Sequence, residues 1–177
     1  MNSFDNSVFY FLDSFARVHS GFDQLMVLIV GNNLLKGGFL VMILWWCWFQ
    51  DHTSQLFVRR RVIITLISCL ITLAIIRIII MIMPFHPRPM HEPSLSFIPP
   101  DGLDPKALEN FSSFPSDHAG LFFALATGIY FISKKAGIIT IAYVLLAICF
   151  PRLYLGYHYA TDILAGILIG ILTTIIL

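Results

Sequence analysis

Charged residues are scarce in this chain. Of its 177 residues only 12% are charged and 58% are hydrophobic, whereas soluble domains average about a quarter charged residues. An apolar surface of this size needs lipid to cover it, so the composition indicates an integral membrane protein. The formal net charge is only +1, which argues against a nucleic-acid-binding protein because such proteins gather Lys and Arg.

Cysteine is also rare. Cys47, Cys69 and Cys149 lie within apolar runs, at spacings that match neither a metal site nor a disulfide framework. We expect them to be buried small hydrophobic residues. No composition shift marks a linker, so we expect residues 1–177 to form a single domain. The sequence does not indicate an oligomeric state.

Long apolar runs, by contrast, are abundant. A helix that crosses a bilayer needs roughly 20 mostly apolar residues. Residues 62–83 meet this requirement with Arg77 as their only charge. Three shorter, nearly uncharged runs follow, separated by breaks at Lys134-Lys135 and Pro151: residues 117–133, 136–150 and 161–177.

The first third of the chain is less regular. Residues 37–50 resemble a span with tryptophans near the membrane interface. Residues 22–35 form either another span or a helix that dips into the membrane and turns at Gly31-Asn32-Asn33, and residues 4–18 have the pattern of a helix in the membrane surface. The sequence therefore predicts an all-α polytopic membrane helix bundle with about five to six transmembrane helices and an N-terminal interfacial helix.

Two basic clusters predict the orientation. Arg59–Arg61 and Lys134-Lys135 fall on the same side of the membrane if the spans alternate, and the positive-inside rule makes that side cytoplasmic. The connections 84–116 and 151–160 then lie on the opposite side. We expect a multi-pass protein of the plasma (inner) membrane with its active site on the extracytoplasmic face.

These two connections carry the polar clusters. In His86-Pro87-Arg88-Pro89 the prolines hold the backbone extended and orient Arg88, whose guanidinium suits phosphate oxygens, although an interface anchor would look the same. In Phe114-Pro115-Ser116-Asp117-His118 a helix start offers free N–H groups to an anion. Alternatively, Ser116 or Asp117 there is only an N-cap.

A third cluster contains Arg152, His158 and Asp162. Positions four apart share a helix face, so Asp162 can accept a hydrogen bond from the His158 ring and leave the other nitrogen free to attack. Such a pair is often only a surface contact. The spans, however, bring it to the same membrane face as Arg88 and His118, and keeping so many ionisable groups at a lipid boundary is costly without a role.

Together the clusters resemble the signature of the type 2 phosphatidic acid phosphatase superfamily, which includes bacterial undecaprenyl-diphosphate phosphatases. That signature is Lys-x6-Arg-Pro, Pro-Ser-Gly-His and Ser-Arg-x5-His-x3-Asp. Matching segments occur here in the same order and with the same internal spacing: Arg88-Pro89, Pro115-Ser116-x-His118 and Arg152-x5-His158-x3-Asp162. The resemblance covers roughly residues 62–177, with the catalytic signature in 84–162.

The resemblance implies a mechanism. His158 would attack phosphorus and form a phosphohistidine, Asp162 would orient its ring, and His118 would act as general acid and then general base. The remaining positions would bind phosphate oxygens without a metal or another cofactor: Arg88, Ser116, Arg152 and the backbone N–H of Asp117.

Three positions depart from the signature. Met81 stands where the leading lysine is expected, Pro151 replaces a serine, and Asp117 replaces a glycine. Pro-Ser-Asp-His is similar to the variant in many undecaprenyl-diphosphate phosphatases, and we expect Asp117 to cap its helix or pair with a base. Arg77, one turn before Met81, is a candidate replacement for the lysine, or else an arginine paired elsewhere in the bundle.

The resemblance and the spans favour a lipid phosphate as substrate and membrane lipids as surroundings. Polyprenyl (undecaprenyl) diphosphate is our first expectation, with phosphatidylglycerol phosphate, phosphatidate and lipid A phosphate as alternatives. The long connection could form a lid in which Lys106, His91 or Glu92 touches the headgroup, or a merely solvated loop. Two other classes stay open, namely a non-catalytic membrane protein and a metal-dependent hydrolase using His86, His91, His118, His158 and Asp162.

Overall fold

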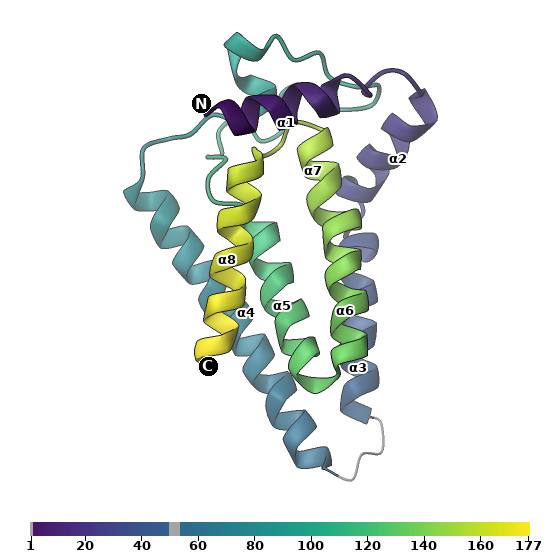
Figure 1. The fold of residues 1–177 in the computed structure, drawn as a ribbon, viewed down its shortest axis with the longest axis vertical. Coiled ribbons are helices and arrows are strands. Elements are labelled where there is room, and N and C mark those ends of the chain that lie inside the picture. The colour runs from purple at the N-terminus through teal and green to yellow at the C-terminus, as the bar shows by residue number, and fades with distance from the viewer. Residues whose placement is uncertain (1, 50–53) are drawn as a thin grey trace.

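The computed structural model describes residues 2–49 and 54–177, and all regular structure within them is helical. Figure 1 shows a bundle of long helices with one helix lying across its end. The helices are α1 (Ser3–Asp13), α2 (Ser20–Gly31), α3 (Phe39–Phe49), α4 (Gln55–Ile82), α5 (Asp117–Ile132), α6 (Lys134–Tyr143), α7 (Phe150–Tyr154) and α8 (Ala160–Ile176).

Helix α5 forms the centre of the bundle and packs against α4, α6 and α8 (Figure 1). Small residues allow this close approach. A Cβ atom on Gly166 or Gly170 of α8 would overlap the backbone of α5, and one on Gly128 of α5 would overlap Thr65 of α4. Van der Waals packing of this kind replaces the hydrophobic effect where helices associate in lipid. It holds the start of α5 firmly beside the start of α8.

The long apolar runs are confirmed as helices. Helix α4 and the continuous segment Lys134–Tyr154 are each long and apolar enough to cross a membrane. The bent pair Ser20–Gly31 and Leu34–Phe49 would be a third span if its two halves cross together. Helices α5 and α8 are apolar but shorter. The three cysteines are free and buried, as predicted.

The break between α2 and α3 falls where the sequence offered a turn. The two halves are bent by 72°, and the Asn32 side chain accepts hydrogen bonds from the backbone N–H groups of Leu34 and Leu35. A wider π-helical turn, Leu34–Gly38, then leads into α3. The amide of Asn32 thus starts a new helix inside an apolar stretch, because it satisfies N–H groups that the bend leaves free.

The predicted break at Pro151 is wrong. Helix α6 continues through a π-helical segment, Val144–Cys149, directly into α7, and Pro151 lies in the first turn of α7. The π-helical widening just before the proline lets the chain stay helical, because a proline has no N–H to place in the ladder. The helix consequently ends three residues later, at Tyr154.

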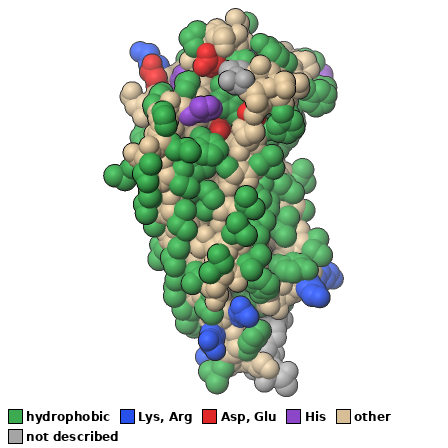
Figure 2. Space-filling view, turned by 60° about the vertical axis from the view of Figure 1, so that its left-hand side comes forward, with side chains coloured by type: hydrophobic (Ala, Val, Ile, Leu, Met, Phe, Trp, Pro, Cys, Tyr) green, Lys and Arg blue, Asp and Glu red, His purple; other side chains and the backbone are tan. Residues whose placement is uncertain are grey.

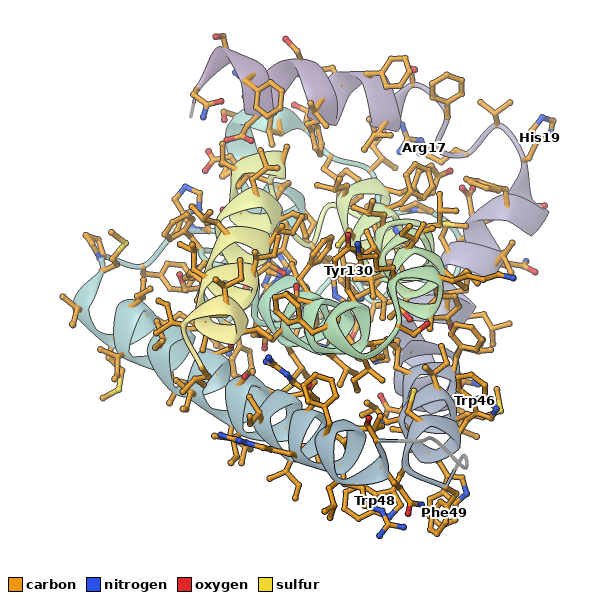
Figure 3. The ribbon with its side chains drawn as sticks, turned by 60° about the horizontal axis from the view of Figure 1, so that its bottom comes forward. Arg17, His19, Trp46, Trp48, Phe49 and Tyr130 are labelled. Carbon is orange, nitrogen blue, oxygen red and sulfur yellow. The ribbon has the colours of Figure 1, made fainter. Side chains whose placement is uncertain are left out.

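The two ends of the bundle differ in charge. Figure 2 shows Lys and Arg gathered mainly at one end of the visible face and acidic and histidine side chains mainly at the other. At the basic end, the guanidinium of Arg59 lies 5.3 Å from the ring centre of Trp48, near the end of α3 where Trp46 and Phe49 also lie (Figure 3). This combination of tryptophan and arginine is typical of a membrane interface.

Helix α1 lies across the opposite end of the bundle (Figure 1). It begins with a cap in which Asn2 accepts a hydrogen bond from the N–H of Asp5, and it ends at Asp13, earlier than predicted. The buried Asp5 carboxylate accepts bonds from the N–H (2.9 Å) and hydroxyl (2.7 Å) of Thr161. Since Thr161 lies in the first turn of α8, α1 is tied to the helix start that carries Asp162.

The connection between α4 and α5 has no long regular element, as predicted from its prolines. Its regular structure is two short 3-10 turns, Pro89–His91 and Pro93–Leu95. The N–H of Ser113 donates to the carbonyl of His86 (2.8 Å), and the N–H of Met90 donates to that of Gly156 (3.0 Å). The first bond joins the two ends of the connection to each other, and the second joins its start to the turn between α7 and α8.

Candidate active site

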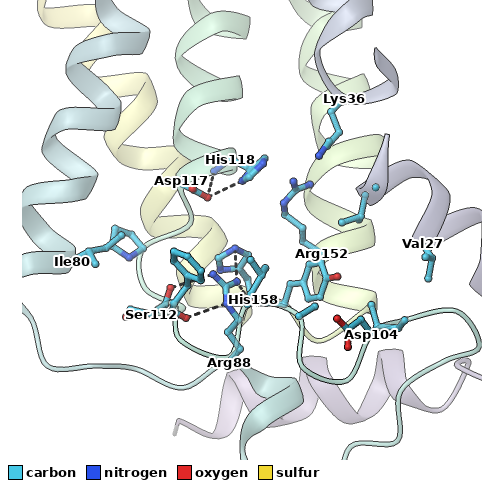
Figure 4. Close-up of a pocket in the computed structure, with 18 of the residues that line it drawn as sticks. Val27, Lys36, Ile80, Arg88, Asp104, Ser112, Asp117, His118, Arg152 and His158 are labelled. Carbon is cyan, nitrogen blue, oxygen red and sulfur yellow. Dashed lines mark hydrogen bonds and ion pairs between the residues drawn. The ribbon is translucent and has the colours of Figure 1, made fainter. Parts of the chain in front are cut away.

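A cavity of about 640 Å³ opens between α2, α4, α5, α7 and the long connection. Figure 4 shows the side chains that face it. The predicted site residues that line it are Arg77, Arg88, Asp117, His118, Arg152 and His158. Ser116 and Asp162 are fully buried and do not line the cavity. The three clusters therefore meet at one cavity, although Arg88 of the first and Arg152 of the last lie 64 positions apart in the sequence.

His158 is held by a tight turn. Gly156 adopts a left-handed conformation (φ +67°), in which an L side chain is strained, and the N–H of Tyr157 donates to the carbonyl of Arg152 (2.9 Å). The His158 ring is then turned back into the bundle, where only 4% of the residue is exposed. The turn formed by the sequence Leu-Gly-Tyr-His thus places the imidazole of His158 in the cavity wall.

Two neighbours set the tautomer of His158. Nδ1 lies 2.8 Å from the backbone carbonyl of Ser113, which only accepts, so Nδ1 carries the proton. Nε2 lies 3.2 Å from Nη1 of Arg88, which only donates. Burial lowers the pKa of the ring, and Arg88 and Arg152 add to this against the opposing effect of Asp162. A neutral ring with its Nε2 lone pair toward the cavity is the form needed for nucleophilic attack.

The predicted direct hydrogen bond from His158 to Asp162 is replaced by an indirect arrangement. The carboxylate oxygen Oδ2 lies 3.7 Å from Nδ1, beyond hydrogen-bonding distance. It accepts instead from the N–H of Tyr159 (2.8 Å) and from the Ser113 hydroxyl. Ser113 thus links the two residues, because its hydroxyl donates to Asp162 and its carbonyl accepts from Nδ1 of His158.

Arg88 is fixed by three backbone carbonyls. Its guanidinium donates to Tyr157 (2.6 Å), Phe111 (3.2 Å) and Ser112 (3.3 Å), and the residue is 6% exposed. An anchored guanidinium beside Nε2 is well placed to hold phosphate oxygens without losing further conformational freedom. The prolines on both sides of Arg88 keep its backbone extended, as the sequence predicted.

His118 is oriented by its neighbour in sequence. Its Nδ1 lies 2.8 Å from Oδ1 of Asp117, and the same oxygen accepts from the backbone N–H of His118 at 2.7 Å. Asp117 therefore pairs with a base, one of the two arrangements expected for it. Since a carboxylate only accepts, Nδ1 is the protonated nitrogen and Nε2 is left for substrate. Both histidines are thus held through Nδ1.

Arg152 and Ser116 have different surroundings. Arg152 is 3% exposed and donates to the carbonyl of Ile148 (3.0 Å); among the described residues it forms no ion pair with a carboxylate. The hydroxyl of Ser116 faces the N–H of Ala119 at 3.4 Å as an N-cap, the alternative that the sequence left open. Ser116 also donates its own N–H to the carbonyl of Asp162 (3.1 Å) and so joins α5 to α8.

The expected lid contacts differ from the prediction. Lys106, His91 and Glu92 do not line the cavity; His91 lies 2.9 Å from the carbonyl of Ala107, and Glu92 accepts from Ser94. The connection covers the cavity instead with apolar side chains, Leu103, Leu108 and Phe111 among them. Within the described ranges no three His, Cys, Asp or Glu residues form a cluster that could hold a metal.

Two residues at the site were not predicted. Ser113 contacts both His158 and Asp162, but a serine in a connection carries no sequence signal. Lys36 lines the cavity from the π-helical turn between α2 and α3. It is the only charge between residues 24 and 50, and an ionisable residue inside an apolar span is a sign of function that could have identified it.

Comparisons with known proteins identify the family that the sequence signature resembles. The PAP2 superfamily matches residues 63–177. Undecaprenyl-diphosphatase BcrC of Bacillus subtilis (strain 168) is 25% identical over 165 residues, which are 93% of this chain and 78% of the relative. Bacitracin transport permease protein BcrC of Bacillus licheniformis is 38% identical over 64 residues, which are 36% of this chain and 31% of the relative.

No solved structure matches the chain significantly. The family match covers α4 from residue 63 onward, α5 to α8 and the whole connection between α4 and α5, and it contains Arg88, His118, Arg152, His158 and Asp162. The apolar helices and the membrane-protein relatives indicate association with a membrane. This chain, a phosphoric ester hydrolase, belongs to the PAP2 superfamily.

Proposed function

We propose that the protein hydrolyses a lipid diphosphate, most favourably a polyprenyl diphosphate, through a phosphohistidine intermediate and without a metal. The observation that carries the proposal is the pair of histidines, each held at Nδ1 and each lining the same cavity between Arg88 and Arg152. One imidazole serves as nucleophile and the other as proton donor and acceptor, which divides a difficult hydrolysis into two easier steps.

In the first step Nε2 of His158 attacks the terminal phosphorus. A nitrogen–phosphorus bond forms, the bond from phosphorus to the bridging oxygen breaks, and His118, which enters this step protonated on both nitrogens, gives the proton on Nε2 to that oxygen. Arg88, displaced from Nε2 but still held by its carbonyl partners, binds equatorial oxygens with Arg152. Arg77, which lines the α4 side of the cavity, supplies a further positive charge there in place of the lysine missing at position 81.

In the second step water attacks the phosphohistidine. His118, now neutral, takes a proton from the water, the nitrogen–phosphorus bond breaks, and inorganic phosphate leaves. Ser113 and Asp162 keep Nδ1 protonated throughout and stabilise the positive charge that the ring acquires. Restoring neutral His158 and protonated His118 closes the cycle.

The lengths of the central helices support a lipid substrate. Helix α5 has 16 residues and α8 has 17, so at about 1.5 Å per residue each spans about 25 Å, less than a hydrocarbon core of about 30 Å. Their N-termini, which carry His118 and Asp162, would therefore lie slightly below the headgroup level. A phosphate could enter the cavity while its lipid tail stays in the bilayer, and the relative named an undecaprenyl-diphosphatase supports the diphosphate class.

A panel of lipid phosphates tests the proposal. Purified protein in detergent should release phosphate fastest from a polyprenyl diphosphate, and more slowly from phosphatidate, phosphatidylglycerol phosphate, lipid A phosphate and polyprenyl monophosphate. EDTA should leave the rate unchanged, and orthovanadate, which mimics five-coordinate phosphorus, should inhibit. A rate lost in EDTA and restored by zinc would contradict the metal-free mechanism, and no release from any lipid would contradict the function.

We further propose five membrane crossings, formed by α2 with α3, α4, α5, the continuous segment Lys134–Tyr154 and α8, with α1 on the outer surface. The two basic clusters then share the cytoplasmic side and the active site faces outward in the plasma membrane. Reporter domains fused after Lys135 should be cytoplasmic, whereas those inserted near Pro100 should be outside. Both reporters on one side would contradict this topology.

A further inference from the structure

Lys36 enters the cavity from outside the region that the family match covers. It lies in the π-helical turn Leu34–Gly38, at the 72° bend between α2 and α3, whereas the family match begins at residue 63. Figure 4 shows its ammonium group pointing toward the guanidinium of Arg152, on the side of the cavity that also holds His118, with Arg88 at the other side. The bend thus supplies a cation that the catalytic signature does not contain.

The positive charges of Lys36 and Arg152 face each other, and the carboxylate of Asp117 attracts Arg152 but not Lys36. The two groups are close enough to repel each other, and Lys36 acts in the same way on His118. Two acidic residues, Asp104 and Asp117, line the same cavity. Among the described residues, however, neither forms an ion pair with Lys36 or Arg152, and the oxygen of Asp117 is taken by His118.

Two facing cations of this kind are costly unless an anion binds to both. Two like charges repel more strongly where the dielectric constant is low, and an ionisable side chain inside an apolar span is retained mainly for a function. Lys36 is half-buried and, within the described part of the chain, its ammonium group forms no hydrogen bond. An anion held by both Lys36 and Arg152 would turn this repulsion into attraction.

The position of His118 indicates which anion. In the proposed first step the attacked phosphate displaces Arg88 from Nε2 of His158 and is bound by both, and His118 protonates the oxygen that leaves it. Beyond that oxygen a monoester has only its alkyl chain, which would meet two cations. A diphosphate has a second phosphate at this point, and its charge matches Lys36 and Arg152.

We propose that Lys36 forms a second phosphate subsite, which shares Arg152 with the attacked phosphate, holds the lipid-linked phosphate of a diphosphate substrate and so selects diphosphates over monophosphates. The inference rests on the proposed function. In the step derived above, the bond between terminal phosphorus and bridging oxygen breaks, and the leaving group is a lipid monophosphate. Its charge would remain on Lys36 while His118 provides the proton.

The test compares two substrates with the same lipid, farnesyl diphosphate and farnesyl monophosphate. Lys36→Met should lower kcat/KM for the diphosphate about tenfold to a hundredfold more than for the monophosphate, the scale of one hydrogen bond to a charged group. Lys36→Arg should retain most of the preference. Arg77 lies at the α4 side of the cavity and would contact the transferred phosphate. Arg77→Met should therefore lower kcat/KM for both substrates alike, by roughly a hundredfold for a transition-state donor.

Lys135→Met, at the far end of the bundle, is the control and should leave the ratio unchanged. Equal losses on both substrates in Lys36→Met, or no loss, would overturn the subsite while the proposed function stands. A binding measurement, which needs no turnover, tests the subsite separately from the proposed function. Inorganic pyrophosphate should raise the melting temperature of the wild type more than inorganic phosphate does, and this difference should disappear in Lys36→Met. If the difference in melting temperature persists in Lys36→Met, the subsite is contradicted, even if the protein has no lipid phosphatase activity.

Discussion

Replacing His158 with alanine is expected to abolish phosphate release and to leave no phosphorylated protein. The imidazole is the proposed nucleophile, and removing the nucleophile of a covalent mechanism lowers turnover by about ten-thousandfold or more. The remaining cations still bind substrate, so KM should change much less than kcat. Water entering the space of the lost ring has no base held at that position, and direct hydrolysis should not rescue the rate.

Rapid quenching with substrate labelled in its terminal phosphate measures this directly. The wild type should yield labelled protein that is stable in base and labile in acid, the behaviour of a phosphoramidate, and His158→Ala should yield none. His19→Ala, which changes an exposed histidine at the start of α2, is the matched control for losing one imidazole. Labelled His158→Ala protein in stoichiometric amount would assign the nucleophile elsewhere.

The sequence predicted the helices well because lipid imposes a simple rule on them. Every backbone polar group in the hydrocarbon must be satisfied within the segment, so long apolar runs become helices with few alternatives. The prediction failed where local chemistry changed the helix without ending it. Before Pro151 the helix widens into a π-helical segment and so continues although the proline has no N–H to donate. No apolar pattern in the sequence indicates such a widening.

The sequence predicted several of the residues that line the cavity, but it did not predict their hydrogen-bond partners, and it missed Ser113 and Lys36. Motif spacing placed Arg88, His118, Arg152 and His158 near one another, and all four line one cavity. The partners of His158 depend on how the end of the connection 84–116 folds back against α8, because Ser113 has no position in a motif. Spacing of i and i+4 predicted a direct hydrogen bond to Asp162, whereas Oδ2 of Asp162 lies 3.7 Å from Nδ1 of His158 and accepts from Tyr159 and Ser113.

Contributions from the N-terminal third were the hardest to predict. Lys36 reaches the cavity only because the chain bends by 72° between α2 and α3, and the sequence could mark a turn there without showing its direction. Met81, the position of the missing lysine, is 84% exposed and lies outside the cavity, whereas its neighbour Ile80 lines it. A lysine restored at position 81 would therefore face away from phosphate, and position 80 is the better site for a rescue in Arg77→Met.

Replacing His118 with alanine is expected to cause a different defect from that of His158→Ala, and one that depends on the substrate. His118 donates a proton in the first step and accepts one in the second, and general acid–base catalysis of this kind contributes about a hundredfold to ten-thousandfold. A lipid monophosphate is a weakly basic leaving group that needs little protonation. An alkoxide, the leaving group of a monoester, is strongly basic and needs the proton. With a diphosphate, His118→Ala should therefore slow hydrolysis of the phosphohistidine more than its formation.

The quench experiment then distinguishes the two substrates. With farnesyl diphosphate, His118→Ala should accumulate labelled protein at a level above that of the wild type, and with farnesyl monophosphate it should not, because formation itself becomes slow. Asp117→Asn, which keeps His118 but weakens the bond that orients its Nδ1, should show a smaller accumulation with the same substrate dependence. If His118→Ala accumulates no phosphoenzyme from the diphosphate while its overall rate falls, the histidine acts before or during phosphoryl transfer only, and the base for the second step must be another group in the cavity.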